Sequence, residues 1–309
     1  MGVCAARTSI SIAGGFDMNR KVRWMCALAL AGLLPATAAA KVAALPIDLS
    51  AGLKPKAENY LSENVYEDES IRVEIERTEV DGTKCYIARV KIADASQLRT
   101  APAYAFNRNQ TAPMESIAQR VNAVLAINGD YYSYQLGMDG GGYLVRQGVK
   151  YNDKAIRGRD VLLIDAKGDF YIEPKLTDEL IAQYEAAGVV NTFNFGPGLV
   201  VNGVKLEECY AYYNQAEDKA QRCAIAQVKR GEPEYLCVVC EGSQQSKGGG
   251  MTIEEFADWV YSLGVENAYN LDGGNSSAMI FDGVKINAVD NKDSRPLSDI
   301  IYFASAAGE

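Results

Sequence analysis

Short hydrophobic runs separated by turn residues recur along most of this chain, and this pattern limits it to a fold rich in β-strands. Residues 71–76 alternate between apolar and charged side chains, which is typical of a strand with one buried face. Asp81 and Gly82 then indicate a hairpin turn into a partner strand over residues 85–90. Residues 124–127 are apolar throughout, which predicts a short strand covered on both faces.

Three segments carry helical signals instead. The run Thr-Ile-Glu-Glu that begins at Thr252 is a capping box, and apolar residues follow at helical spacing as far as Val260. Thr177 begins a second helix that Gly188 closes, and a shorter helix is expected over residues 113–122. The sequence therefore predicts an α+β fold, with a single mixed β-sheet domain and a few amphipathic helices.

The first 40 residues are typical of a secretory signal peptide. Arg20, Lys21 and Arg23 precede an apolar run over residues 24–34, and small residues suited to cleavage follow. An uncleaved anchor is the alternative, but a membrane span needs roughly 20 apolar residues. We therefore expect an exported protein, secreted or held in the cell envelope, that meets a membrane only transiently through residues 1–40.

The remaining chain divides at about residue 70. Residues 41–69 contain two prolines and scattered charges, and we expect a short N-terminal arm or linker that packs poorly. Residues 70–309 hold the strand and helix signals and are expected to form one domain.

The charge of the chain argues against nucleic acid as a partner. Its formal net charge is −9, and residues 1–40 carry four basic and one acidic side chain, so the rest has a net charge of −12. An acidic body repels the phosphate backbone, and no basic stripe is present in the sequence.

The sequence contains no histidine. This excludes Ser-His-Asp and Cys-His catalysis and the H-E-x-x-H type of zinc site. Acid–base chemistry would have to come from carboxylates. No cluster of metal ligands stands out, so we expect neither a metal nor another cofactor, and a chelator should leave activity intact.

Five cysteines follow residue 40, which leaves at least one of them unpaired. Cys237 and Cys240 have C-x-x-C spacing, but they fall in a predicted strand, where this spacing places the two sulfurs on opposite faces. We expect buried thiols there rather than a redox or zinc site. A bridge between Cys209 and Cys223, which flank a polar loop, remains open.

The sharpest polar motif is Asn-Leu-Asp-Gly-Gly-Asn-Ser-Ser over residues 270–277, at the end of an apolar strand. Paired glycines let a ligand approach the backbone and allow the turn amides to face it. Asp272 would then stand at the strand end beside N–H groups suited to an anion. An ordinary turn with a capped hairpin is the alternative.

Weaker motifs accompany it. Residues 128–132 place an amide, a carboxylate and two phenols after an apolar strand, and residues 194–198 form a rigid glycine-proline loop. The guanidinium groups of Arg222 and Arg295 suit a phosphate, although isolated arginines are more often surface charges. Glycines between residues 241 and 252 lead into a helix N-terminus, which can bind an anion or serve as a flexible connection.

The order of these motifs resembles the phosphodiester glycosidase family over about residues 120–303. The resemblance rests on the runs INGDYY, FGPGLVVNG, RCAIA, GMT, NLDGGNSS and RP, in that order. Two blocks depart from the family pattern. Glu241-Gly242-Ser243 stands where Asp-Gly-Arg is usual, and Cys223 and Ala226 replace two small residues of an Arg-Thr-Ala-Ile-Gly block.

The resemblance implies a glycosidase that splits a sugar-1-phosphodiester, similar to a GlcNAc-1-phosphodiester, at the anomeric carbon. It implies a role in envelope or extracellular polysaccharide metabolism. Asp272 would act as nucleophile or base, with Asp130 or Glu241 as its partner. Arg222 and Arg295 would neutralise the phosphate. The other residues expected to bind substrate are Asn128, Gly129, Asn194, Gly196, Asn270, Gly273, Gly274, Ser276 and Ser277.

Two other functions remain open on the sequence. One is a non-catalytic protein of the envelope that binds polysaccharide. The other is a phosphodiesterase that breaks the P–O bond, usually with metals, although the lack of histidine and of a dense acidic cluster argues against it.

Overall fold

The hairpin expected from the alternating pattern forms the centre of the largest sheet. Strand β3 (Ile71–Val80) buries its apolar side chains, and β4 (Thr83–Ile92) pairs with it along its whole length. Asp81 and Gly82 connect them with φ angles of 48° and 77°, the left-handed conformation of a two-residue hairpin turn. The hairpin is confirmed.

The computed structural model divides the chain into two units, Met1–Ala40 and Lys41–Glu309. The residues that the structure describes all belong to the second unit. They are 42–106, 108, 110–130, 142–154, 158–207, 216–242, 249–288 and 295–307.

Nine strands form the large sheet, in the order β1-β2-β3-β4-β15-β14-β16-β12-β13. All its pairings in the described residues are antiparallel. The bounds of the remaining strands of this sheet are β1 Tyr60–Ser62, β2 Val65–Glu67, β15 Glu234–Cys240, β14 Arg222–Gln227, β16 Asn267–Leu271, β12 Gly198–Val201 and β13 Val204–Lys205.

A five-stranded sheet, in the order β18-β17-β6-β19-β5, contains the apolar run expected to be covered on both faces. Residues Val124–Ile127 of β6 (Ala123–Asn128) are at most 1% exposed. The other strands are β18 Val284–Lys285, β17 Met279–Phe281, β19 Asp299–Ala304 and β5 Leu98–Pro102. Two smaller sheets contain β10 Phe170–Glu173, β9 Val161–Asp165 and β11 Val189–Phe193, and β7 Leu144–Arg146 and β8 Val149–Asn152.

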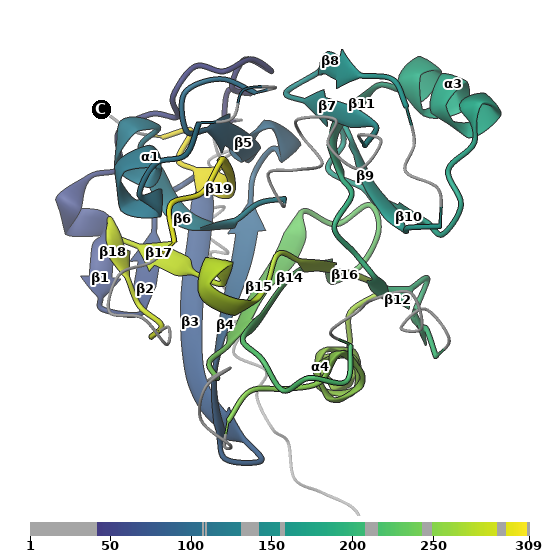
Figure 1. Cartoon of the computed structure of the whole chain (residues 1–309). Helices are drawn as coiled ribbons and strands as arrows, with labels where there is room; N and C mark the ends of the chain where they lie inside the picture. Colours follow the sequence, from purple (N-terminus) through teal and green to yellow (C-terminus); the bar gives the residue numbers. More distant parts are fainter. Residues whose placement is uncertain are drawn as a thin grey trace, which may run out of the picture. The chain divides into compact units, whose positions relative to one another are not determined.

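The two larger sheets share one hydrophobic core. Ile225 of β14 and Tyr269 of β16 belong to the same buried cluster as Leu125 of β6 and Ile301 of β19. The opposite face of the nine-stranded sheet packs against helix α4 (Ile253–Ser262), which lies beside β12 in Figure 1. The sheets therefore meet face to face, and the polar residues that end their strands lie at the edge of this core.

The helices begin where the sequence places their caps. Thr252 accepts a hydrogen bond from the N–H of Glu255, whose side chain accepts from the N–H of Thr252 in return, so the predicted capping box is confirmed. Helix α3 (Asp178–Ala187) ends at Gly188 with a φ of 84°. Helix α1 (Met114–Arg120) packs on the five-stranded sheet. In the described residues, no helix is long and apolar enough to cross a membrane.

The α+β class is thus confirmed, while its strands divide over several sheets. The segment before residue 70 differs from the expected linker. Its strands β1 and β2 extend the large sheet, and Tyr66 is fully buried. Arg99 also holds this segment through hydrogen bonds to the carbonyl oxygens of Pro46 at 2.7 Å and Asp48 at 3.0 Å. These long-range contacts are not visible in local composition.

The cysteines of the C-x-x-C motif lie on opposite faces of the large sheet, as their spacing in a strand predicts. Cys237 is buried in the core between the sheets and Cys240 in the core beneath α4, so the two lie on opposite faces as expected. Cys223 is a buried thiol inside β14 whose side chain faces the core between the sheets, and the bridge considered between Cys209 and Cys223 stays a prediction. Cys209 itself lies outside the described residues.

Candidate active site

The candidate site lies where strands β6 and β16, from the two packed sheets, both end. Asn128 is the last residue of β6, and its Nδ2 donates a hydrogen bond of 2.7 Å to the carbonyl oxygen of Asp272. Its Oδ1 accepts from the N–H of Ala278 at 3.1 Å. Both polar atoms of the Asn128 side-chain amide therefore bind backbone, and the side chain holds the Asp272 turn against the neighbouring sheet.

The two glycines after Asp272 allow strand β14 to approach the turn. A Cβ atom on Gly273 would lie 3.0 Å from the carbonyl oxygen of Gln221. That same oxygen accepts a hydrogen bond of 2.9 Å from the N–H of Gly274, whose φ is 58°. The glycines thus serve close packing of backbone on backbone, in addition to any ligand approach expected from the sequence.

The carboxyl group of Asp272 is buried at this turn. Burial raises its pKa to about 6, and the negative charge of Asp299 adds to the rise. A hydrogen bond with Ser276, the charge of Arg295 and the N–H of Gly273, at 2.9 Å, act in the opposite direction. A carboxyl group with such a pKa is poised to exchange protons or attack near neutral pH.

Asp130 is the second buried carboxyl group of the site. Its Oδ2 accepts from the N–H of Asn194 at 2.8 Å and lies 3.6 Å from Arg146. Burial raises its pKa to about 6; the cation of Arg146 opposes this rise, and the charge of Asp299 adds to it. Asp130 and Asp272 therefore both interact with the same third carboxylate, that of Asp299.

Asp299 and Arg146 are the site residues that sequence reasoning missed. Their side chains are fully buried and form an ion pair of 3.1 Å. The Arg146 guanidinium carbon also lies 4.3 Å from the centre of the Phe193 ring. Asp299 begins the apolar strand β19 and Arg146 ends the apolar strand β7. A charged residue at the end of an apolar strand was the one signal available.

The carboxylate of Asp299 explains why position 129 is a glycine. A Cβ atom at Gly129 would lie 2.4 Å from Oδ1 of Asp299. That oxygen accepts a hydrogen bond of 3.1 Å from the N–H of Asp130. The absence of a side chain at Gly129 therefore admits the Asp299 carboxylate, and this contact gives the position a structural role beside the substrate binding expected from sequence.

Several buried polar atoms at this end of the sheets lack a hydrogen-bond partner in the described structure. Asn270 shows the pattern, because its Nδ2 donates to the carbonyl oxygen of Gly196 at 2.7 Å while its Oδ1 has no partner. Buried polar groups are normally paired, so such atoms are suited to a ligand. The others near the site are Oδ1 of Asp130, Oδ1 of Asn194, Oγ of Ser277 and both amide atoms of Gln221.

The remaining predicted residues have defined contacts of their own. Arg295 donates to Oγ of Ser276 at 3.3 Å and interacts with Asp272, so it belongs to the site. Arg222 donates to the carbonyl oxygens of Met251 at 2.9 Å and Asp218 at 2.7 Å. Arg222 and Cys223 are consecutive in β14, so their side chains point to opposite faces of the sheet. Because Cys223 faces the core between the sheets, Arg222 projects toward α4.

Glu241 directly follows β15, at the same end of the large sheet as the Asp272 turn. Its Oε1 accepts from the hydroxyl of Tyr86 and from the N–H of Ala288, each at 2.7 Å. If the pairing of β14 with β15 and with β16 is continued by one or two residues, Gln221 lies between Glu241 and Gly273. The structure thus brings Asp130 into the Asp299 cluster with Asp272 and places Glu241 two strands away. Tyr131, Tyr132 and Ser243 lie outside the described residues.

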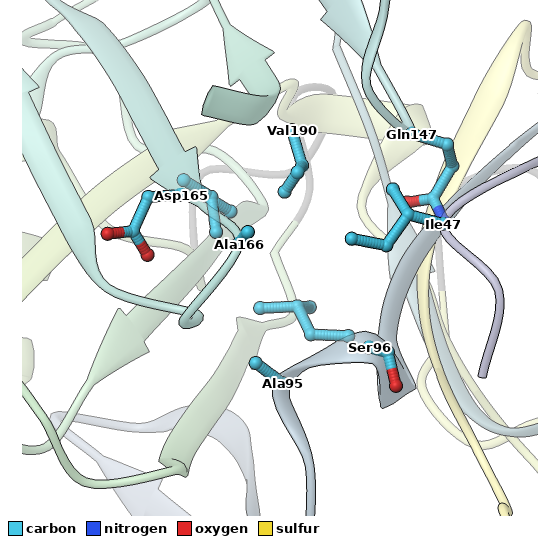
Figure 2. A pocket seen from close by; sticks show the side chains of 9 residues that line it. Ile47, Ala95, Ser96, Gln147, Asp165, Ala166 and Val190 are labelled. Carbon is cyan, nitrogen blue, oxygen red and sulfur yellow. The ribbon is translucent and has the colours of Figure 1, made fainter. Parts of the chain in front are cut away.

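A small pocket elsewhere in the molecule is unsuited to this chemistry (Figure 2). It is lined mostly by apolar side chains, and none of the predicted site residues contributes to it. Asp165 is its one ionisable lining residue. A sugar site needs several converging polar groups, so the carboxyl cluster remains the better candidate.

The fold and the site define an α+β protein with buried carboxyl groups at the ends of strands from two packed sheets. The chain belongs to the phosphodiester glycosidase family, whose sequence profile matches residues 121–304. A search of curated protein sequences found no significant match.

Two solved structures share the fold. One is the catalytic domain of zebrafish N-acetylglucosamine-1-phosphodiester alpha-N-acetylglucosaminidase, auto-inhibited by its pro-peptide. It is 16% identical with a TM-score of 0.61, over 82% of this chain and 87% of that one. The other is a hypothetical protein from Synechocystis, 16% identical with a TM-score of 0.50, over 78% of this chain and 64% of that one.

Proposed function

We propose that this protein hydrolyses a glycosyl phosphodiester at the anomeric carbon, releasing a sugar and a phosphomonoester. The observation that carries the proposal is the pair of buried carboxyl groups, Asp130 and Asp272, whose pKa values are both raised to about 6. Two carboxyl groups are the machinery that most glycosidases use. The family membership supports the same class of reaction.

The chemistry of the leaving group fits the residues available. A phosphomonoester has a second pKa near 6, so it departs without a strong general acid. Asp272 attacks the anomeric carbon or activates water, and Arg295, which interacts with Asp272, neutralises the departing phosphate. Asp130 is the partner carboxyl group in this scheme.

The unpartnered acceptors support a polyhydroxylated substrate. Oδ1 of Asn194 and Oδ1 of Asn270 are buried, and their amide nitrogens are already held by backbone carbonyl oxygens. Each oxygen is therefore fixed in position and free to accept from a sugar hydroxyl. Gln221 adds both a donor and an acceptor.

Hydrolysis in oxygen-18 water tests the reaction. A glycosidase places the label in the sugar, because water attacks the anomeric carbon. Label in the phosphate would instead identify a phosphodiesterase, and binding of the sugar phosphodiester without turnover would identify a binding protein. A GlcNAc-1-phosphodiester is the first substrate to use.

The raised pKa of Asp272 sets the expected pH dependence. If Asp272 acts as a carboxylate, kcat/KM should fall about tenfold per pH unit below about pH 6, because protonation removes the reactive form. The measurement is kcat/KM across a pH range in which the protein stays folded. An acidic limb near pH 4, the ordinary value for aspartate, would contradict the role of a buried carboxylate.

The two predicted arginines should behave differently. Arg295→Gln should lower kcat/KM for a phosphodiester about 10- to 100-fold, the effect of losing a charge-assisted hydrogen bond to the phosphate. Aryl glycosides, whose leaving group has no phosphate, should lose much less.

Arg222→Gln, which removes the same charge, serves as the matched control. The Arg222 guanidinium binds backbone carbonyl oxygens, so we expect equal losses on both kinds of substrate. A loss confined to the phosphodiester would return Arg222 to the phosphate role that the sequence suggested, and equal losses for Arg295→Gln would remove Arg295 from it.

Export is part of the proposal and rests on residues 20–40. We expect mass spectrometry of the secreted or envelope protein to find an N-terminus near Ala39 or Lys41. Mature protein that retains residues 24–34 would show an uncleaved anchor instead.

A further inference from the structure

Cys85 and Cys240 lie directly opposite each other on the adjacent strands β4 and β15. The N–H of Glu241 donates to the carbonyl oxygen of Lys84 at 2.8 Å, so the neighbouring pair is hydrogen-bonded. Alternation along an antiparallel ladder makes Cys85 and Cys240 a non-hydrogen-bonded pair, and the Cα atoms of such pairs are typically about 4.5 Å apart. This separation falls within the range that disulfides span, about 4.4 to 6.8 Å.

Both side chains also project from the same face of the sheet. They belong to the buried cluster beneath α4 and are 1% and 0% exposed. As thiols they donate weak hydrogen bonds to backbone carbonyl oxygens, Cys85 to that of Thr83 at 3.3 Å and Cys240 to that of Ala220 at 3.9 Å. Thiols are weak donors, so little is lost if the two sulfurs rotate toward each other.

We propose that Cys85 and Cys240 form a cross-strand disulfide when the protein folds in an oxidising environment. A disulfide oxidant such as glutathione disulfide accepts two electrons and two protons from the thiols and leaves as two glutathione molecules. The exchange passes through a mixed disulfide with one of the two cysteines.

The bond forms before the strands close. Burial raises the pKa of each thiol to about 12, so the folded protein holds almost no thiolate to start the exchange. The closed disulfide then joins β4 to β15 beside the hydrogen bond between Tyr86 and Glu241. It closes a long loop, the case in which a cross-link stabilises most.

The chain provides its own control cysteines. Cys237 lies opposite Ala88 and Ile225, and Cys223 lies opposite Val239 and Leu271, so neither has a cysteine directly across from it. Both face the other core. They should remain thiols under the conditions that oxidise Cys85 and Cys240.

Peptide mapping tests the cross-link. The full chain is refolded with reduced and oxidised glutathione, alkylated under denaturing, non-reducing conditions, and digested. We expect peptides containing Cys85 and Cys240 to be joined and two hydrogens lighter than their sum, with Cys223 and Cys237 alkylated. Alkylation of all four, or a bridge from Cys85 or Cys240 to another cysteine, would overturn the proposal.

A stability measurement provides an independent readout. The Tm of the oxidised protein should exceed that of the reduced protein by on the order of 5 to 10 °C. Cys85→Ala should abolish this difference, whereas Cys237→Ala should keep it. A difference that survives in Cys85→Ala would place the bridge elsewhere. Neither readout uses catalysis, so the cross-link and the proposed glycosidase reaction stand or fall separately.

Discussion

Asp272→Asn is expected to lower turnover by at least about three orders of magnitude, which corresponds to roughly 4 kcal/mol of transition-state stabilisation. The substitution keeps the shape of the side chain and an oxygen that can accept from the N–H of Gly273. It removes the negative charge that attacks the anomeric carbon or activates water. The measurement is kcat on a sugar-1-phosphodiester, with folding checked by circular dichroism.

The stability of the same variant separates catalysis from a structural role. The folded state raises the pKa of Asp272 from 3.8 to about 6, so the folded protein holds this proton more tightly than the unfolded chain. Protonated Asp272 contributes roughly 3 kcal/mol to the free energy of unfolding below about pH 4. This contribution is lost as pH rises through about 6.

The neutral asparagine avoids this loss. Asp272→Asn should therefore melt at the same temperature as the wild type or higher above pH 6, and the difference should shrink toward pH 4. A lower Tm at pH 7 with turnover intact would reduce Asp272 to a turn residue and remove the mechanism with it.

Arg146→Met is expected to produce the largest loss of stability, on the order of 3 to 5 kcal/mol. The guanidinium pairs with Asp299 at 3.1 Å and Asp130 at 3.6 Å, and all three side chains are fully buried. Methionine fills much of the space but leaves two buried carboxylates without their cation. For a chain of this size, the loss corresponds to a fall in Tm of about 10 °C.

The loss should depend on pH in one direction. Without Arg146, the folded-state pKa of Asp130 rises further, because the cation that opposes its rise is gone. A raised carboxyl pKa removes stability as pH rises through it. The difference in Tm from the wild type should therefore be greatest near pH 8 and smaller near pH 5, where protonation relieves the repulsion.

Arg99→Met is the matched control. Arg99 is as deeply buried, but it binds mainly neutral oxygens, including the carbonyl of Pro46 and the hydroxyl of Tyr302. Asp48, its one carboxylate partner among the residues that the structure describes, is half exposed. We expect a loss of stability that changes little with pH. If both variants respond to pH alike, the carboxyl cluster is not the source of the effect.

The elements that the sequence predicted share a local cause. Asp81 and Gly82 determine the β3–β4 hairpin because both adopt the left-handed conformation that its turn requires. Thr252 and Glu255 fix the start of α4 through hydrogen bonds across three residues. The C-x-x-C cysteines fall on opposite faces because side chains alternate along a strand.

The carboxyl cluster depended on tertiary structure. Asp299 reaches Arg146 across 153 residues, and it reaches Asp130 only because β19 pairs with β6 in one register. The sequence by itself placed Asp130 and Asp272 at the ends of apolar strands and gave Gly129 only as a residue expected to bind substrate. Only the packing of the sheets decided that Gly129 admits the carboxylate of Asp299, because pairing between distant strands leaves no local pattern.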